Sequence, residues 1–226
     1  MKKSVIIWIV VASLLIFSGC ILFVVAMSFA GWNFSLLSTA ETEINEYEIT
    51  EPYNTISVKS VTSDVVFLPS RDNKTSVICR EYKNANHSVE VKNNTLTIEI
   101  RDTRKWYEHI NIVDINSPEI IVYIPESECS SLFVELTTGD VELREIKFDK
   151  IKIHLTTGDV ELYECDACEI EIKTTTGDVE GSLLSGKNFI ASTTTGDVEI
   201  PRSTDGGECK ITTTTGDIEI TVKALR

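Results

Sequence analysis

The hexapeptide Thr137-Thr138-Gly139-Asp140-Val141-Glu142 decides the fold, because near-identical copies of it return four more times before the chain ends. The glycines of the five copies are separated by 19, 19, 19 and 20 residues. A fixed period in this range is typical of architectures that stack one supersecondary unit along an axis. The glycine and aspartate of each copy are Gly139, Asp140, Gly158, Asp159, Gly177, Asp178, Gly196, Asp197, Gly216 and Asp217.

Apolar and polar residues alternate on both sides of each hexapeptide, which is the period of a half-buried β-strand. Counted from the glycine, positions −7 and −5 are apolar in every copy, and position −3 changes from Leu to Thr along the chain. We predict that these positions point inward, together with +2, +4 and +7. Cys165 and Cys209 fall at inward positions, where a free cysteine behaves as a small hydrophobic residue. Leu184 is the expected inward residue at +7 of the third copy.

Nineteen residues are enough for two or three short strands joined by tight turns, each strand pairing with its equivalent about 4.8 Å away in the next coil. We expect the glycine to adopt positive φ at the turn and the following aspartate to accept backbone N–H groups. The sequence therefore predicts an all-β solenoid over residues 48–226, with divergent coils in 48–130 and regular repeats in 131–226.

Two outward columns would carry carboxylates, one of Asp and one of Glu. Like charges about 5 Å apart in water repel by roughly 0.8 kcal/mol, which turn hydrogen bonds can offset. Such ladders are therefore acceptable as structure alone. A second hypothesis is that the Asp ladder binds Ca²⁺, although the nonapeptide pattern of calcium-binding β-rolls is absent. The Glu column is Glu142, Glu161, Glu180, Glu199 and Glu219.

The N-terminus has an almost unbroken apolar run from Val5 to Ala30, long enough to cross a bilayer core of roughly 30 Å. Lys2 and Lys3 before it favour a cytoplasmic N-terminus. We predict that segment 1–30 is an uncleaved anchor that contacts the membrane through residues 4–30, that 31–47 is a linker, and that the rest is extracytoplasmic. The alternatives are a lipoprotein cleaved before Cys20, within Phe17-Ser18-Gly19-Cys20, and a secretory signal peptide.

The remaining features exclude several functions. A net charge of −14 argues against a nucleic-acid partner. Cys165-x-x-Cys168 has neither a second such pair nor a histidine pair to complete a metal site, so no cofactor or metal is expected. The segment from Asp102 to Ile110 holds Trp106, Tyr107 and His109, which would form either an aromatic lid or a ligand site.

The Thr-Thr-Gly-Asp-Val-Glu repeats, the stretch His87–Ile98 and the stretch Lys105–Ile110 together resemble the bacterial putative adhesin family, a domain of unknown function. The resemblance covers about Tyr53 to Val222. It implies a right-handed β-solenoid in the cell envelope, with no catalytic residues. Some members of the family are linked to envelope-stress responses.

These observations predict a non-enzymatic, membrane-anchored surface interaction module that binds an envelope polymer or protein. One alternative is a self-assembling envelope scaffold. Because Ile218 to Lys223 ends the chain as a strand without a polar capping repeat, the C-terminal coil is the expected edge for self-association. A further alternative is an enzyme that modifies an envelope polymer, which would need facing carboxylates in a concave site.

Overall fold

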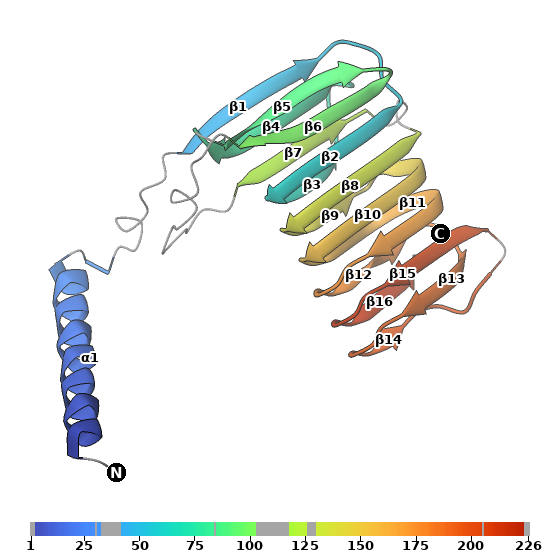
Figure 1. Cartoon of the computed structure of the whole chain (residues 1–226). Helices are drawn as coiled ribbons and strands as arrows, with labels where there is room; N and C mark the ends of the chain where they lie inside the picture. Colours follow the sequence, from blue (N-terminus) through green and yellow to red (C-terminus); the bar gives the residue numbers. More distant parts are fainter. Residues whose placement is uncertain are drawn as a thin grey trace. The chain divides into compact units, whose positions relative to one another are not determined.

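The protein was analysed as a computed structural model that describes residues 3–29, 31–32, 42–83, 85–102, 118–125, 130–204 and 206–223. Its chain divides into one unit that contains the helix and another that contains the strands (Figure 1). The elements are α1 (Lys3–Phe29), β1 (Thr42–Ile49), β2 (Thr55–Thr62), β3 (Asp64–Pro69), β4 (Thr75–Tyr82), β5 (Ala85–Lys92), β6 (Thr95–Asp102), β7 (Glu119–Ile124), β8 (Ser131–Thr138), β9 (Val141–Arg144), β10 (Lys147–Thr157), β11 (Val160–Lys173), β12 (Val179–Leu183), β13 (Lys187–Ser192), β14 (Val198–Glu199), β15 (Gly207–Thr212) and β16 (Ile218–Val222).

Helix α1 is apolar around its whole circumference. Its segment Trp8–Phe29 has a mean hydropathy of 2.9 and is long enough to cross a membrane. A helix of 27 residues is about 40 Å long, somewhat more than the hydrocarbon core. A membrane anchor and a signal sequence both have this length and composition, so these two properties do not distinguish them.

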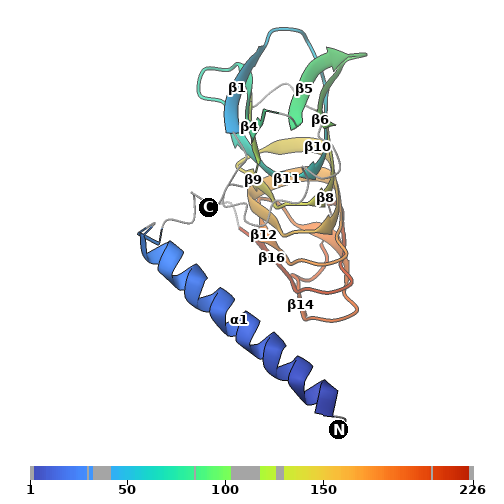
Figure 2. The ribbon, with the colours of Figure 1, turned by 60° about the vertical axis from the view of Figure 1, so that its left-hand side comes forward.

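The strands form two parallel ladders. The first ladder has the order β6-β2-β8-β10-β11-β15-β13. The second has the order β7-β3-β9-β11-β12-β16-β14. Figure 2 shows the turns of chain from β8 to β16 stacked on one another. The structure is thus mostly β with one apolar helix among the described residues, and equivalent strands of the first three repeats pair at a spacing of 19 residues.

Strand β11 belongs to both ladders, because its first residues pair with β9 and its last residues pair with β10. The hydrogen-bonded path therefore closes on itself, from β10 through β8, β2, β6, β5, β4, β7, β3, β9 and β11 back to β10. This closure was not predicted from the repeats, which indicate stacking but not the point where one strand turns a corner without a break.

The first strands depart from the expected divergent coils. Strands β2, β3, β6 and β7 join the ladders in parallel, as expected, but β4 pairs antiparallel with β1 and β7, and β5 pairs antiparallel with β6. For β5 and β6 the reason is local, since Asn93 and Asn94 both have positive φ in the two-residue turn between these strands, and such a turn reverses the chain. Strand β1 begins at Thr42, inside the expected linker.

The predicted inward columns are largely confirmed. Positions −7 and +2 are fully buried in the first three repeats, and Cys165 and Cys209 are buried as expected. One residue was assigned wrongly, because Leu183 and not Leu184 is buried in the third repeat. The pairing of β11 with β12 shifts register between Leu162 and Cys165, so the inward residue moves by one position.

The Gly-Asp turns stack directly on one another. The five turn glycines have φ between 135° and 143°. A Cβ on Gly158 would lie 2.0 Å from the carbonyl oxygen of Gly139, so no side chain fits there. Beside this contact, the Oδ1 atom of Asp140 accepts the backbone N–H of Asp159 at 2.8 Å. The expectation of positive φ is confirmed, while the aspartate bonds to the neighbouring coil instead of to its own turn.

The last two coils are interleaved. Asp178 accepts the N–H of Asp217, and Asp217 accepts the N–H of Asp197, both at 2.7 Å. The fifth repeat therefore lies between the third and the fourth, and β16 pairs with β12 on one side and β14 on the other (Figure 1). The fourth repeat is therefore outermost, but β14 pairs only with Ile218 and Glu219 of β16, so self-association through the C-terminal coil stays a prediction.

A buried lysine lies where the chain passes from the third repeat to the fourth and leaves room between them for the fifth. Between Leu183 and Lys187 the chain must advance two coil spacings, about 10 Å. The Nζ atom of Lys187, whose side chain is 5% exposed, lies 2.6 Å from both Asp166 Oδ1 and Ser185 Oγ. Removing one partner of such a pair would leave an unpaired buried charge, so this contact stabilises the skipped connection.

The Gly-Asp stack predicts that Gly177→Val lowers the free energy of unfolding by about 3 kcal/mol or more, roughly 10 °C in Tm, because a Cβ would lie 2.0 Å from the Gly158 carbonyl oxygen. Thermal unfolding measures the effect. The exposed neighbour Thr175→Val is the control and should leave Tm unchanged. An unaltered Tm in Gly177→Val would contradict the stack.

The interleaved order of the coils predicts that Ala substitutions at position +2 after the turn glycine destabilise the fourth and fifth repeats to different extents. Ile218 is 1% exposed, so Ile218→Ala should lower the free energy of unfolding by about 3 kcal/mol. Val198 is 41% exposed, so Val198→Ala should lower it by less than about 1 kcal/mol. If the coils were stacked in chain order, Ile218 would lie in the end coil and Val198 would be buried. The costs of the two substitutions would then be reversed. Equilibrium unfolding in denaturant distinguishes the two.

Candidate functional site

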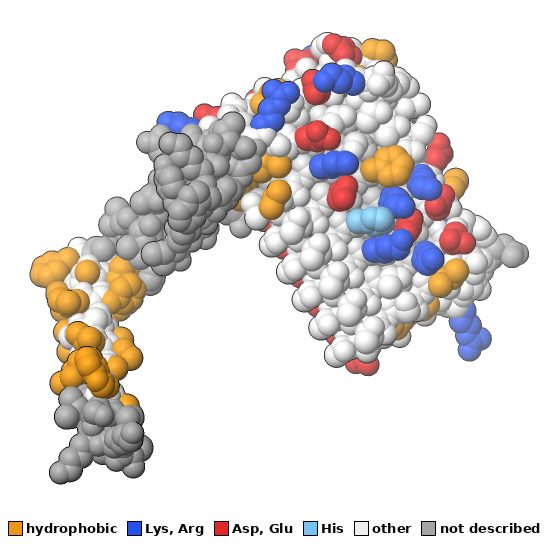
Figure 3. Space-filling model, in the orientation of Figure 1, with side chains coloured by type: hydrophobic (Ala, Val, Ile, Leu, Met, Phe, Trp, Pro, Cys, Tyr) orange, Lys and Arg blue, Asp and Glu red, His pale blue; other side chains and the backbone are white. Residues whose placement is uncertain are grey.

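The outward face of the first ladder carries acidic and basic side chains in the same row. One row runs from Glu99 in β6 through Lys59, Glu135 and His154 to Lys173 in β11. Figure 3 shows acidic and basic side chains intermixed on this face. Lys59 and Glu135 form an ion pair at 3.5 Å. Because neighbouring charges compensate each other, this face offers both signs of charge to a ligand.

The second ladder differs, since its Glu column is unbroken. Pairing in register places Glu142, Glu161 and Glu180 in one row, and Glu219 and Glu199 continue it. The interleaved coils therefore leave the predicted Glu ladder intact and change only its order.

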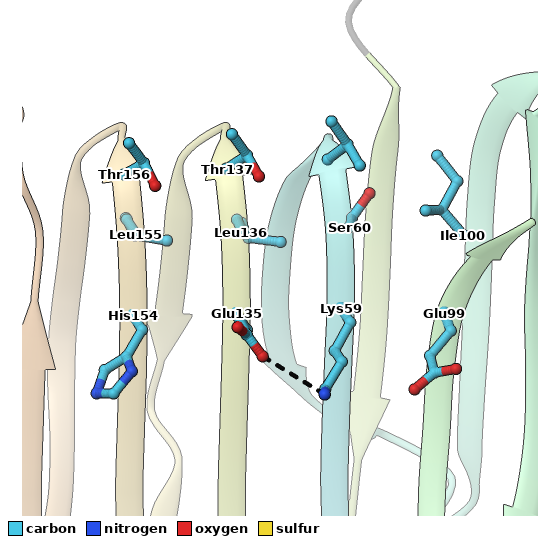
Figure 4. A pocket seen from close by; sticks show the side chains of 11 residues that line it. Lys59, Ser60, Glu99, Ile100, Glu135, Leu136, Thr137, His154, Leu155 and Thr156 are labelled. Atoms are coloured by element: carbon cyan, nitrogen blue, oxygen red, sulfur yellow. Dashed lines mark ion pairs between the residues drawn. The ribbon is translucent and has the colours of Figure 1, made fainter. Parts of the chain in front are cut away.

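A hollow of about 490 Å³ lies on the first ladder where β2 and β6 separate. Their pairing ends at Lys59 and Glu99. Beyond this pair, Ser60 and Ile100 border the space between the two strands, and exposed Thr137 from β8 lies on the far side of β2 (Figure 4).

His154 lines the same hollow and is the least satisfied polar group on this face. Its Nε2 atom is buried and has no hydrogen-bond partner among the described residues. Burial lowers the pKa of His154, and the nearby Lys152 and Lys173 lower it further. The imidazole is therefore neutral at neutral pH, and its buried Nε2 atom lies 3.9 Å from Glu171 Oε1, beyond hydrogen-bond reach.

A buried polar cluster lies beneath the strand end at Ser60. The Nδ1 atom of His87 is 2.7 Å from Glu81 Oε2, and its Nε2 atom is 3.2 Å from Ser60 Oγ and 3.4 Å from Ser63 Oγ. The side chains of Glu81 and His87 are 0% exposed. Asn45 donates to the other carboxylate oxygen of Glu81 at 2.7 Å. Each side chain of this Ser60–His87–Glu81 cluster thus has a partner.

Sequence reasoning missed this cluster, although a signal was present. In three strands the inward column begins apolar and becomes polar at one end: Ser60 follows Val58, Glu81 follows Cys79, and His87 precedes Val89. Only the pairing of β2 with β6, of β6 with β5, and the hairpin from β4 to β5 bring these three ends together.

The cluster is a poor metal site. Cys79 lies beside Glu81 and His87, and their ligand atoms are within 4.8 Å of one another. However, burial raises the pKa of the Cys79 thiol to about 12, with a smaller contribution from Glu81. The thiolate that a metal requires is therefore strongly disfavoured, and Glu81 and His87 already bind each other.

The residues predicted from the sequence have structural roles. The turn glycines and aspartates hold coil to coil, and the Oδ1 atoms of Asp64, Asp140, Asp159, Asp178 and Asp217 each accept an N–H from the next coil. One carboxylate oxygen of each remains for solvent, so calcium binding stays a prediction. Cys165 is buried and Cys168 is exposed, so this pair does not present two thiols to one site. Trp106, Tyr107 and His109 lie outside the described residues.

Comparison with known proteins places the fold. Residues 53–225 match the family described as Toastrack DUF4097. No curated protein matches significantly. The solved structure of a putative cell adhesion protein from Clostridium sporogenes shares 16% identity with a TM-score of 0.60, over 82% of this chain and 100% of that one. A putative adhesin from Bacteroides fragilis shares 16% identity with a TM-score of 0.42, over 81% and 98% of the two chains. The first of these supports the fold alone.

The row beside His154 makes stability depend on pH. Hydrogen bonds from Lys173 and Lys152 lower the pKa of Glu171 from 4.5 to about 2. A lowered carboxyl pKa stabilises the fold above the unfolded-state pKa, and this contribution is lost as the pH falls through the folded value. We expect Glu171→Gln to have a lower Tm than wild type near neutral pH, and the difference to shrink between pH 4.5 and about 2.

Thermal unfolding across this range measures the effect. Glu161→Gln is the matched control in the same strand, where Glu142 and Glu180 flank the carboxylate, and it should not be destabilised. A pH-independent difference for Glu171→Gln would contradict the expectation.

Proposed function

The chain belongs to the Toastrack DUF4097 family, and from this premise we propose that it is a surface interaction module whose binding face is the outward face of the first ladder. One observation carries the proposal, namely the hollow of about 490 Å³ whose border combines the charges of Lys59, Glu99 and Glu135 with the neutral imidazole of His154. Such a face suits an extended polar ligand, because successive strands present a side chain in the same row about every 4.8 Å. An envelope polymer or an extended protein segment has this character.

We further propose that the strand unit is a right-handed β-solenoid held at the outer side of a membrane by α1. Parallel connections within one sheet are right-handed in nearly all proteins, which supports the hand. The apolar segment Trp8–Phe29 and the lysines before it support an anchor with a cytoplasmic N-terminus. The description of a Clostridium sporogenes structure as a putative cell adhesion protein supports the surface role.

A self-assembling scaffold is the second candidate, and the interleaved coils relocate its interface. The outermost fourth repeat leaves Val198 41% exposed and Ile190 47% exposed. If copies of the chain associate end to end, this repeat would supply most of the edge, together with the part of β16 that lies beyond its pairing with β14.

A photocrosslinking amino acid placed at Thr137 tests the binding face, because Thr137 is exposed and lines the hollow. We expect it to capture a specific partner in intact cells, whereas the same group at Asp149, exposed outside the hollow, should capture little. Equal capture at both positions, or none at Thr137, would exclude this face. A crosslink from Val198 to a second copy would support the scaffold instead.

A further inference from the structure

We infer that Ser60 is a nucleophile for acyl transfer, with His87 as its general base, Glu81 as the residue that positions His87, and a carboxylic ester as substrate. This activity goes beyond the proposed binding role and departs from the expectation of a non-enzymatic protein. It rests on the geometry of the Ser60–His87–Glu81 cluster and on the hollow that borders Ser60.

The geometry matches what an activated serine requires. Its hydroxyl needs a base within hydrogen-bond reach, and the base needs a third group to fix its orientation. Ser60 Oγ lies 3.2 Å from His87 Nε2, and His87 Nδ1 lies 2.7 Å from Glu81 Oε2. With Nδ1–H donating to Glu81, the Nε2 lone pair faces Ser60. Asn45 donates to Glu81 at 2.7 Å and holds the carboxylate in place.

The hollow gives a route to the serine. Ser60 is among the residues that line the space of about 490 Å³, at the point where β2 and β6 no longer pair. Figure 4 shows Ser60 and Ile100 at the facing ends of these strands. The other hydroxyl near His87, that of Ser63, does not line the hollow and is 3.4 Å from Nε2. Ser63 is 2.8 Å from Ser60 Oγ and therefore orients the nucleophile without being one.

The position of Ser60 in the repeat is also unusual for a structural residue. Register pairs Ser60 with Leu136 of β8, and Leu136 with Leu155 of β10, both of which are buried. An apolar residue therefore fits this column. A buried polar cluster is no more stabilising than apolar residues of the same volume, so packing alone does not account for three polar residues here.

The reaction balances without a cofactor. As Ser60 Oγ bonds to the ester carbonyl carbon, its proton passes to His87 Nε2, and Glu81 stabilises the imidazolium. His87 then gives this proton to the departing alkoxide oxygen as the ester C–O bond breaks, releasing an alcohol. Water attacks the acyl-serine in the same way, with His87 taking its proton and returning it to Ser60 Oγ, and a carboxylic acid leaves.

The substrate is inferred to be an ester of a small acyl group. A hollow of about 490 Å³ is the size of a small-molecule site and is too small for a folded partner. Lys59, Glu99 and Glu135 at its border would face the alcohol portion, which favours a polar, hydroxyl-rich alcohol over an apolar one.

The test uses the full chain in detergent micelles with a fluorophosphonate probe and with p-nitrophenyl acetate. We expect the probe to label Ser60 of the wild-type protein. Mass spectrometry of peptides from the labelled protein identifies the modified residue. Ser60→Ala should abolish labelling and reduce ester hydrolysis by roughly 100-fold, the scale of general-base-assisted attack, whereas Ser63→Ala should retain most of both. Thermal unfolding confirms that each variant is folded.

The role of Glu81 has its own readout. In Glu81→Gln the imidazole loses the carboxylate that fixes its orientation, so labelling of Ser60 should slow although the variant is folded, and the conservative Glu81→Asp should restore part of the rate. The proposal is overturned if the folded wild-type protein is labelled no more than a heat-denatured control. It is equally overturned if the label lies on another residue or if Ser60→Ala keeps its hydrolysis rate.

Discussion

The stacked Gly-Asp turn is the contact on which the strand unit depends. Each glycine carbonyl leaves no room for a Cβ on the glycine of the next coil, and each aspartate Oδ1 accepts the next backbone N–H at 2.7 to 3.0 Å. The two contacts fix both the distance and the register between coils. All side chains beyond the turn then fall into columns, so Val141, Val160 and Val179 are all buried and the Glu side chains align on the outer face.

The same columns explain how chemistry arises on a repetitive scaffold. Where a column keeps the residue type that most repeats share, its side chains contribute only core packing or a ladder of like charges. Where it departs from the consensus, as at Ser60, a polar side chain occupies an inward position and must find partners. The antiparallel hairpin of β4 and β5 supplies Glu81 and His87 as those partners. The candidate chemistry thus lies where regular repeats meet irregular strands.

The outward faces of the two ladders differ in their charges. Compensated charges, a hollow and a neutral histidine lie on the first ladder, while the second carries an unbroken Glu row that keeps like charges in water. Because the fourth repeat is outermost, Val198 and Ile190 expose apolar surface at that end of the stack. Position in the stack, more than residue type, decides which of these apolar residues are exposed.

The sequence by itself determined the period, the inward columns and the need for glycine at the turn, because a repeat of 19 to 20 residues with alternating polarity allows few other arrangements. It also indicated the apolar N-terminal helix. Tertiary structure alone decided that the fifth repeat inserts between the third and fourth, because near-identical coils present near-identical edges and local sequence does not distinguish their order. It alone decided that Ser60, Glu81 and His87 meet, since their contact depends on pairings between strands far apart in the chain.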